Sequence, residues 1–265
     1  MRPLPALAAA LSLLAAVPAQ AALAPPNAAG VTFGHVHLNV PDIAAQQAFW
    51  ARYFGGVAIR HGAQAGVRFP SGFLILLTKA DGAPPSAGSG LDHFGFKVAD
   101  LPAFLAAWRS DGREVINEIV GMEGTPAANL VGPDGVKIEV QEERGVPAPI
   151  ANHIHFQTAE NAALRDWYVA TLDLEPTTRG RLATAAAVPG MGLSFSASRI
   201  PVVGTKGRAI DHLGFEVRNL DAAVAALRAK GVAVEPVRRE AGFKSAFLTD
   251  PQGVRVELTE GLAGY

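Results

Sequence analysis

The sequence predicts an α+β fold built from four copies of one unit, each with a strand, a helix and two or three further strands. Four stretches share one layout, and they begin at His35, Asp92, Asn152 and Asp211. Each stretch opens with alternating residues around a histidine, which is typical of a strand. Apolar residues at spacings of three and four follow, which is typical of a helix. Because an internal repeat outweighs any local pattern, it decides the predicted architecture.

The elements within each unit follow from local signals. Helices are expected directly after Asp42, Asp100 and Asn219, because these side chains can accept hydrogen bonds from the first free N–H groups of a helix. A further helix is expected around 164–172, where Leu164 and Tyr168 share an apolar stripe. Strand-like runs come after the helices, at 73–77, 136–140 and 254–258.

The four units form two larger copies. The spacing between equivalent residues is nearly constant, at 118 residues between His35 and His153 and 119 between His93 and His212. Each copy has an ordinary domain size. The expected organisation is a first domain at 31–142, a linker containing Pro and Gly at 143–149, and a second domain at 150–262.

The first residues have the layout of a secretory signal peptide. Arg2 is followed by an apolar run at 4–17, and small residues precede a cleavage point after Ala21. The run is too short to span a bilayer comfortably. We expect a signal peptide at 1–21, a flexible lead-in at 22–30, and a mature protein that is periplasmic or secreted and free of the membrane.

Composition excludes several classes of function. The formal net charge is −1, which argues against a nucleic-acid partner because phosphate binding needs a basic face. Cysteine is absent, which excludes disulfides, thiolate metal sites, Fe–S clusters and cysteine nucleophiles. Any metal must therefore be bound by nitrogen and oxygen.

Each copy carries two histidines and one glutamate on the polar faces of its strands. Strand side chains alternate between two faces, so the histidines and the glutamate face away from the apolar side that packs. Two imidazoles and one carboxylate can bind one face of a divalent metal and leave the other face open to substrate oxygens. The predicted metal ligands are His35, His93 and Glu139 in the first copy and His153, His212 and Glu257 in the second.

Two further histidines share the same strand faces. His37 and His155 each lie two residues after a predicted ligand. They are candidate catalytic residues that exchange protons or donate hydrogen bonds to a substrate. The alternative is a supporting role behind the ligands or in a solvent-filled cavity.

These motifs resemble the vicinal oxygen chelate superfamily, which includes glyoxalase I, extradiol dioxygenases, fosfomycin-resistance enzymes and bleomycin-resistance proteins. The resemblance rests on His35 in HVHLNVPD, His93 in DHFGFKV, and the turn GPDG at 132–135 that leads to Glu139. The second copy repeats it with His153, His212 and the turn DPQG that leads to Glu257. The resemblance implies four βαβββ modules paired into two open barrel domains, a divalent metal such as Fe²⁺, Mn²⁺, Zn²⁺ or Ni²⁺, and a small-molecule substrate.

The sequence also departs from two members of that superfamily. The tyrosine of extradiol dioxygenases is replaced by Asn129 in the first copy and Phe247 in the second, and 238–244 contains no histidine. The glutamate that glyoxalase I adds from its first module falls near Leu76. The expected function is therefore an exported metal-dependent enzyme with lyase, isomerase or dioxygenase chemistry on vicinal oxygens. The alternative is a non-catalytic binding protein of the bleomycin-resistance type; a metal-handling protein fits less well, and the chain is expected to be a monomer or homodimer.

Overall fold

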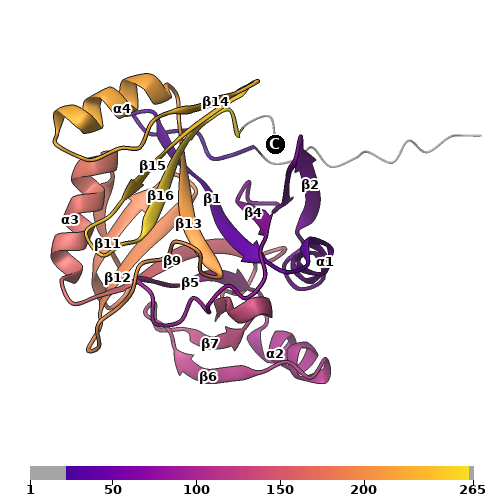
Figure 1. The fold of residues 1–265 in the computed structure, drawn as a ribbon. Coiled ribbons are helices and arrows are strands. Elements are labelled where there is room, and N and C mark those ends of the chain that lie inside the picture. The colour runs from indigo at the N-terminus through magenta and orange to yellow at the C-terminus, as the bar shows by residue number, and fades with distance from the viewer. Residues whose placement is uncertain (1–21, 263–265) are drawn as a thin grey trace, which may run out of the picture.

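The computed structural model describes residues 22–262, and the predicted signal peptide at 1–21 lies outside them. The described chain consists of four βαβββ units (Figure 1). The first unit is β1 (Val31–Val40), α1 (Ile43–Phe54), β2 (Val57–His61), β3 (Gln64–Arg68) and β4 (Leu74–Lys79). The second is β5 (Leu91–Val98), α2 (Leu101–Ser110), β6 (Val115–Val120), β7 (Pro126–Val131), the short 3₁₀ turn η1 (Pro133–Gly135) and β8 (Lys137–Glu142).

The second half of the chain repeats this order. The third unit is β9 (Ile150–Thr158), α3 (Asn161–Leu172), β10 (Glu175–Arg179), β11 (Leu182–Val188) and β12 (Met191–Ala197). The fourth is β13 (Ile210–Val217), α4 (Leu220–Ala229), β14 (Arg238–Glu240), β15 (Phe243–Thr249) and β16 (Arg255–Glu260). The α+β class and the four repeated modules agree with the prediction.

Three helices begin where the capping residues predicted. The side chains of Asp42, Asp100 and Asn219 accept hydrogen bonds of 2.8–3.0 Å from the N–H groups three residues ahead. These bonds satisfy donors that have no partner within the helix. The helix α3 has Glu160 at the same position and no such side-chain bond.

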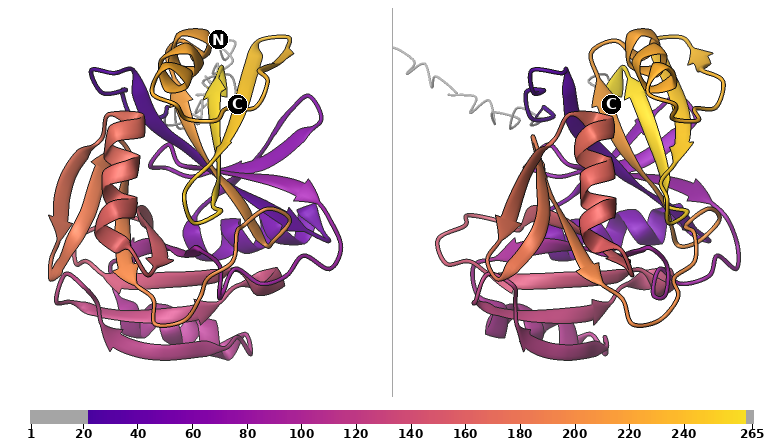
Figure 2. Two further views of the ribbon diagram at one scale, coloured as in Figure 1. Left: turned by 60° about the vertical axis from the view of Figure 1, so that its left-hand side comes forward. Right: turned by 90° about the vertical axis from the view of Figure 1, so that its left-hand side faces the viewer.

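Each sheet combines one unit from the first half of the chain with one unit from the second half. One sheet has the order β14-β15-β16-β13-β1-β4-β3-β2, and the other has β10-β11-β12-β9-β5-β8-β7-β6. The first unit therefore pairs with the fourth, and the second with the third (Figure 2). The prediction that each half of the chain forms its own barrel differs from this topology.

The strands are paired in the same way in both sheets. Antiparallel β1 and β13 form the centre of one sheet, and antiparallel β5 and β9 form the centre of the other. Each central strand then has a parallel neighbour from its own unit, so both sheets are mixed. Equivalent units of a duplicated chain thus occupy equivalent places in the two sheets.

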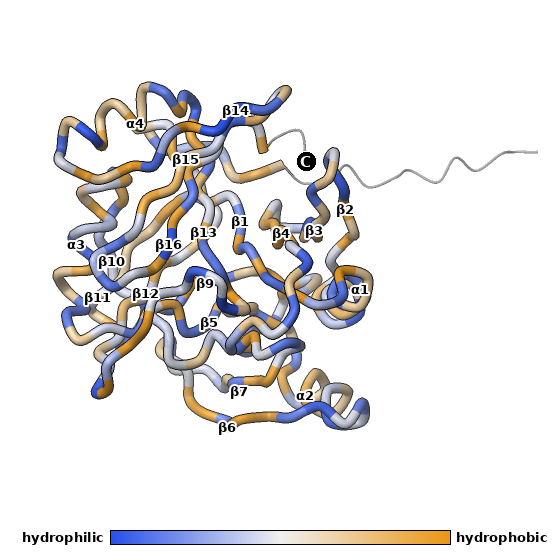
Figure 3. Tube along the Cα trace, viewed as in Figure 1, coloured by the Kyte–Doolittle hydropathy of each residue, from blue (hydrophilic) through white to orange (hydrophobic). Residues whose placement is uncertain are grey.

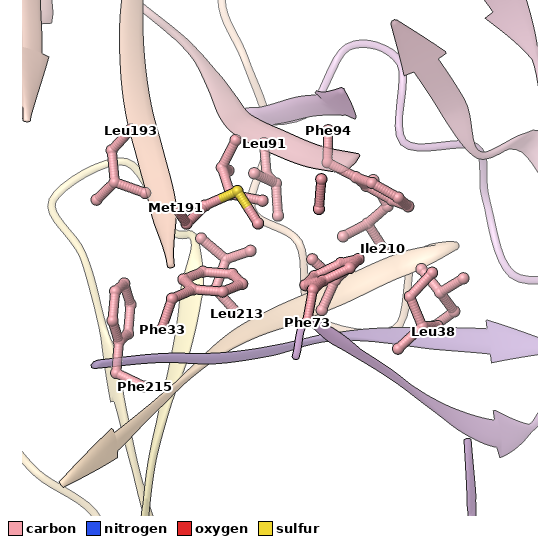
Figure 4. Packing of buried hydrophobic residues seen from close by; sticks show 14 of the residues in the cluster. Phe33, Leu38, Phe73, Leu91, Phe94, Met191, Leu193, Ile210, Leu213 and Phe215 are labelled. Carbon is pink, nitrogen blue, oxygen red and sulfur yellow. The ribbon is translucent and has the colours of Figure 1, made fainter. Parts of the chain in front are cut away.

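The main core lies between the sheets and beneath the helices. Phe33 and Leu213 from one sheet pack near Leu91 and Met191 from the other (Figure 4). Apolar and polar residues alternate along many of the strands (Figure 3), so the face opposite the core carries the polar side chains. Trp50, Trp108 and Tyr168 are the largest fully buried side chains.

The segment at 22–30 is held by hydrogen bonds. The side-chain amide of Asn27 donates to the carbonyl of Asp173, and its side-chain oxygen accepts from the N–H of Val31. The N–H of Arg218 donates to the carbonyl of Gly30. Among the described residues, no helix is both long enough and apolar enough to cross a membrane.

Candidate metal centres

The first candidate centre lies where the first and fourth units meet. It consists of His35 on β1, His212 on β13 and Glu257 on β16, which we call the first site. Glu257 Oε2 lies 3.2 Å from His35 Nε2 and 3.3 Å from His212 Nε2. Three strands therefore bring two imidazoles and one carboxylate to a common point, the donor set of an open divalent-metal site.

A glycine makes this approach possible. Gly214 on β13 stands beside His35 on one side and beside Glu257 on the other. A Cβ at Gly214 would lie 2.0 Å from Cε1 of His35, well inside the distance that real side chains tolerate. The ring of His35 occupies the space that a larger residue would fill.

The neighbouring carboxylate fixes the ring of His212. Asp211 Oδ1 lies 2.6 Å from His212 Nδ1, so this nitrogen donates its proton and Nε2 is left facing Glu257. Although burial alone lowers the pKa of His212, its contacts with Asp211 and Glu257 raise it above the ordinary value. A carboxylate behind a histidine ligand is the usual way in which proteins orient that ligand.

The charge states of Glu257 and His35 suit a cation. Burial alone raises the pKa of Glu257, but its close contacts with the rings of His212 and His35 hold it well below its usual range. Burial lowers the pKa of His35, which favours the neutral ring. An ionised carboxylate and a neutral imidazole are the forms that bind metals.

Unpartnered nitrogen atoms provide a test of whether a metal fits. Among the described residues, Nδ1 and Nε2 of His35 and Nε2 of His212 are buried side-chain atoms without an aligned hydrogen bond. Buried polar atoms normally have partners because leaving them unsatisfied costs about 1–3 kcal/mol each. A cation between His35 Nε2, His212 Nε2 and Glu257 would satisfy two of the three atoms, so the residues present fit a divalent metal.

His37 lies at the edge of the first site. Its ring stacks on that of His212, with centroids 4.4 Å apart, and its Nε2 lies 2.7 Å from Thr78 Oγ1. Burial and the neighbouring imidazoles lower its pKa well below the ordinary value. The ligand atoms of His35, His37 and His212 lie within 4.8 Å of one another, so His37 could also contact a bound ion.

The first site opens into a cavity of about 770 Å³. This volume is in the range of small-molecule pockets. His37, His212 and Glu257 line it, together with Phe247 and Arg238. His61, the last residue of β2, lines this cavity as well.

An equivalent centre lies where the second and third units meet. It consists of His93 on β5, His153 on β9 and Glu139 on β8, which we call the second site. Glu139 lies 3.6 Å from His93 Nε2 and 3.5 Å from His153 Nε2. Asp92 lies 2.7 Å from His93 Nδ1, as Asp211 does beside His212.

The second site repeats the first in its surroundings. A Cβ at Gly95 would lie 2.2 Å from Cε1 of His153. His155 Nε2 lies 2.7 Å from Ser196 Oγ, and burial lowers the pKa of His155 to about 3. The ligand atoms of His93, His153 and His155 lie within 4.8 Å of one another. The described part of the chain thus contains two histidine clusters that could hold a metal ion.

A buried arginine distinguishes the second site from the first. Arg179, at the end of β10, lies with Nη2 3.2 Å from Glu139 Oε1 and 2.8 Å from Gln141 Oε1. Its Nε donates to Glu123 over 2.9 Å. The guanidinium group is buried and contacts the carboxylate of the second site directly.

The sequence matches the glyoxalase/bleomycin resistance protein/dioxygenase superfamily over residues 32–140 and again over 150–258. The chain belongs to this superfamily. The match is repeated over both copies, as the internal repeat predicted. Membership of this superfamily supports a metal-dependent, enzyme-like role. The curated proteins contain no match to the chain.

Solved structures share the fold. Glyoxalase I from Zea mays is 18% identical, covers 88% of this chain and 94% of its own, and superposes with a TM-score of 0.70. A putative dioxygenase from Bacillus subtilis subsp. subtilis str. 168 is 13% identical, covers 91% of this chain and 86% of its own, and superposes with a TM-score of 0.68. At these identities the likeness concerns the fold of the superfamily.

The topology corrects how the predicted ligands group. His93 and Glu139 were expected to share a site with His35, but they lie with His153. His212 and Glu257 were expected to share one with His153, but they lie with His35. The reason is that β1 pairs with β13 and β5 pairs with β9, so one histidine of each site comes from the other copy.

Sequence patterns missed two features of the centres. Strand neighbours face opposite ways, so alternation alone would point Asp92 and Asp211 away from the ligands, yet each bonds to the ring of the histidine that follows it. Arg179 carried no signal of its own in the sequence. Its alignment with His61, 118 residues earlier, was the one available indication that it reaches a site.

Proposed function

We propose that the protein is a divalent-metal-dependent enzyme whose working centre is the first site, and that it acts on a small molecule with two neighbouring oxygen atoms. One observation carries the proposal: buried imidazole nitrogens without hydrogen bonds converge with an ionised carboxylate at the floor of a cavity of about 770 Å³. A site with three protein ligands and open positions is typical of catalytic metals.

The residues of the first site divide into ligands and supports. His35, His212 and Glu257 would hold the ion, and Asp211 orients the ring of His212. When bound, the metal supplies Lewis-acid polarisation of the two substrate oxygens. Thr78 fixes the ring of His37 through Nε2, which leaves Nδ1, a buried atom without a hydrogen bond, as the atom that exchanges a proton with the substrate.

One wall of the cavity combines an apolar surface with two arginines, which suits a substrate with an anionic group. Phe247 offers an apolar surface, and the guanidinium carbons of Arg255 and Arg238 lie 3.6 and 5.4 Å from its ring centroid. Arg255 is also within 3.3 Å of Asp211, whereas Arg238 is exposed on β14. Because Phe247 has no hydroxyl group, it cannot donate the proton that a tyrosine there would, which favours isomerase or lyase chemistry over ring cleavage.

Metal content tests the site assignment. Purified protein is expected to contain one ion per chain by elemental mass spectrometry. Glu257→Gln removes it, whereas the matched variant Glu139→Gln in the second site retains it. Protein without stoichiometric metal would instead favour the non-catalytic binding protein.

Proton transfer tests the catalytic assignment. His37→Gln is expected to keep the metal and to lose exchange of substrate protons with deuterated water, followed by nuclear magnetic resonance with hydroxyketones and ketoaldehydes as probes. His155→Gln, the equivalent change at the second site, is expected to keep both the metal and the exchange of substrate protons. Equal exchange rates in the two variants would refute the role of His37.

We further propose that the chain is exported as a monomer or homodimer. The support is the layout of residues 1–21, with a basic start, an apolar run and small residues before the cleavage point. Sequencing the amino terminus of the mature protein is expected to begin at Ala22. A mature protein that begins at Met1 would contradict export by this route.

A further inference from the structure

The two sites have the same ligands and the same supporting aspartates but differ in what lies beside the glutamate. We infer that the guanidinium group of Arg179 occupies the second site in place of a metal ion, so that the protein holds one metal although it has two complete sets of ligands. This goes beyond the proposed function, which concerns the first site.

Three acceptors hold Arg179 in this position. Its Nη2 contacts Glu139 and Gln141 at 3.2 and 2.8 Å, and its Nε contacts Glu123 at 2.9 Å. Arg179 itself is only 8% exposed. A buried arginine with these charge-assisted bonds is a persistent partner for Glu139 rather than a mobile surface side chain.

The segment that contains Glu123 is held in place by hydrogen bonds from Arg181. The N–H of Arg181 donates to the carbonyl of Met122 over 2.9 Å. The guanidinium of Arg181 donates to the carbonyls of Val120 and Gly121 at 3.2 and 3.1 Å. The turn between β6 and β7, which carries Glu123, is therefore tied to the end of β10, which carries Arg179.

The first site lacks each part of this arrangement. The residue 118 positions before Arg179 is His61, whose side chain is shorter. The residues 118 positions after Glu123 and Gln141 are Ala241 and Thr259. The side chain of Ala241 cannot accept a hydrogen bond. The hydroxyl of Thr259 already donates to Glu216 over 2.6 Å.

The environment of the histidines differs accordingly. At the second site, His153 Nε2 lies 3.4 Å from His93 Nε2 in a hydrogen-bonding arrangement. At the first site, the equivalent nitrogens of His35 and His212 have no aligned hydrogen bond. A fixed positive charge beside Glu139 also repels a second cation. Charge and hydrogen bonding thus both disfavour a metal at the second site.

Metal stoichiometry tests this inference. Titration of metal-free protein with Zn²⁺, followed by calorimetry and by elemental analysis after gel filtration, is expected to give one ion per chain for the wild type and two for Arg179→Met. Arg179→Lys keeps the cation and is expected to stay at one. Adding Glu139→Gln to Arg179→Met is expected to return the count to one.

A second variant tests the inference independently, in case Arg179→Met does not fold. Arg179→His introduces the residue that the first copy has at the equivalent position, His61. This variant is also expected to bind two ions. Its melting temperature is expected to fall more on chelation than that of the wild type, because bound metal stabilises the folded state. The inference would be overturned if Arg179→Met and Arg179→His both bound no more ions than the wild type, or if the wild type bound two.

The outcomes separate this inference from the proposed function. If the first site bound no metal, the wild type would contain none while Arg179→Met gained one, so the proposed function would fail and the inference would stand. If the first site bound metal and Arg179→Met gained nothing, the inference alone would fail.

Discussion

At the scale of single residues, the carboxylate of Asp211 decides which nitrogen of His212 is available to an ion. It lies 2.6 Å from Nδ1, and it also accepts from the N–H of Gly207. Its own pKa is lowered because the bond to His212 outweighs the effect of burial, so it is ionised at neutral pH. The ring is therefore presented through Nε2.

Replacing Asp211 by Asn is expected to weaken metal binding at the first site by about 10- to 100-fold, the usual effect of removing the residue that orients a histidine ligand. The measurement is competition for Zn²⁺ against a chelating dye. The matched control is Asp92→Asn, which makes the same change at the second site. An equal loss of affinity in both variants would show that the effect is not local to the first site.

A second residue-scale feature is the buried carboxyl group of Asp250. Burial raises its pKa to about 6, although it accepts hydrogen bonds from the N–H groups of Gln252 and Val254 and from Tyr168. A pKa that is higher in the folded state contributes stability below the unfolded value of 3.8, and this contribution is lost as pH rises through about 6.

Asp250→Asn is expected to remove this pH dependence. Between pH 4 and pH 7 the wild type should lose up to about 3 kcal/mol of unfolding free energy relative to the variant, because each unit of pKa shift corresponds to about 1.4 kcal/mol. Urea unfolding of both proteins across this range measures the difference. A difference that stays constant with pH would contradict a raised pKa for Asp250.

At the scale of the elements, the central strands carry both ligands and the space they need. On β13, His212 is a ligand and Gly214, two residues on, leaves room for the ring of His35 from β1. The strand β5 does the same with His93 and Gly95 for His153. His35 and His153 therefore each depend on a glycine in a unit other than their own.

Gly214→Ala is expected to displace the ring of His35, because the new Cβ would lie 2.0 Å from Cε1. Overpacking of this kind costs about 1–3 kcal/mol of stability. The metal of the first site is expected to be lost at the same time, as measured by elemental analysis of the folded variant. Gly95→Ala should cost similar stability and retain that metal.

The helices and strands themselves were largely predictable from local signals. Asp42, Asp100 and Asn219 mark helix starts because a side-chain cap acts within three residues. The stretch at 120–129 is partly strand, since β7 begins at Pro126. Its small polar and apolar residues are typical of a loop, but pairing with β8 determines their conformation.

At the scale of the whole molecule, each sheet joins units that are separated by long stretches of chain or by the linker at 143–149. His35 and Glu257 lie at opposite ends of the described sequence and meet through β1, β13 and β16. Folding of the first site therefore requires both copies.

A pair of engineered cysteines can test this pairing in a chain that has no cysteine of its own. Val31 of β1 lies opposite Val217 of β13. Opposed residues of antiparallel strands have Cα atoms about 4.5–5.5 Å apart, which a disulfide can bridge. Val31→Cys with Val217→Cys is expected to form an intramolecular disulfide, detected by intact mass before and after reduction.

The control pair is Val31→Cys with Val98→Cys. Val98 holds on β5 the position that Val217 holds on β13, but β1 and β5 belong to different sheets. This pair is expected to stay reduced. Cross-linking of the control pair in place of the first would mean that neighbouring units in the sequence share a sheet.

The sequence by itself determined the four modules, the starts of three helices, and the six histidines and two glutamates that face away from the core. These features depend on the alternation and spacing of residues that are close together in the sequence. Only the tertiary structure decided which ligands share a site and where the guanidinium of Arg179 lies. The repeated units have similar strand patterns, so their local sequence does not distinguish one partner from another. That choice depends on contacts between residues far apart in the chain, from 53 positions for Lys97 and Ile150 to 186 positions for Val31 and Val217.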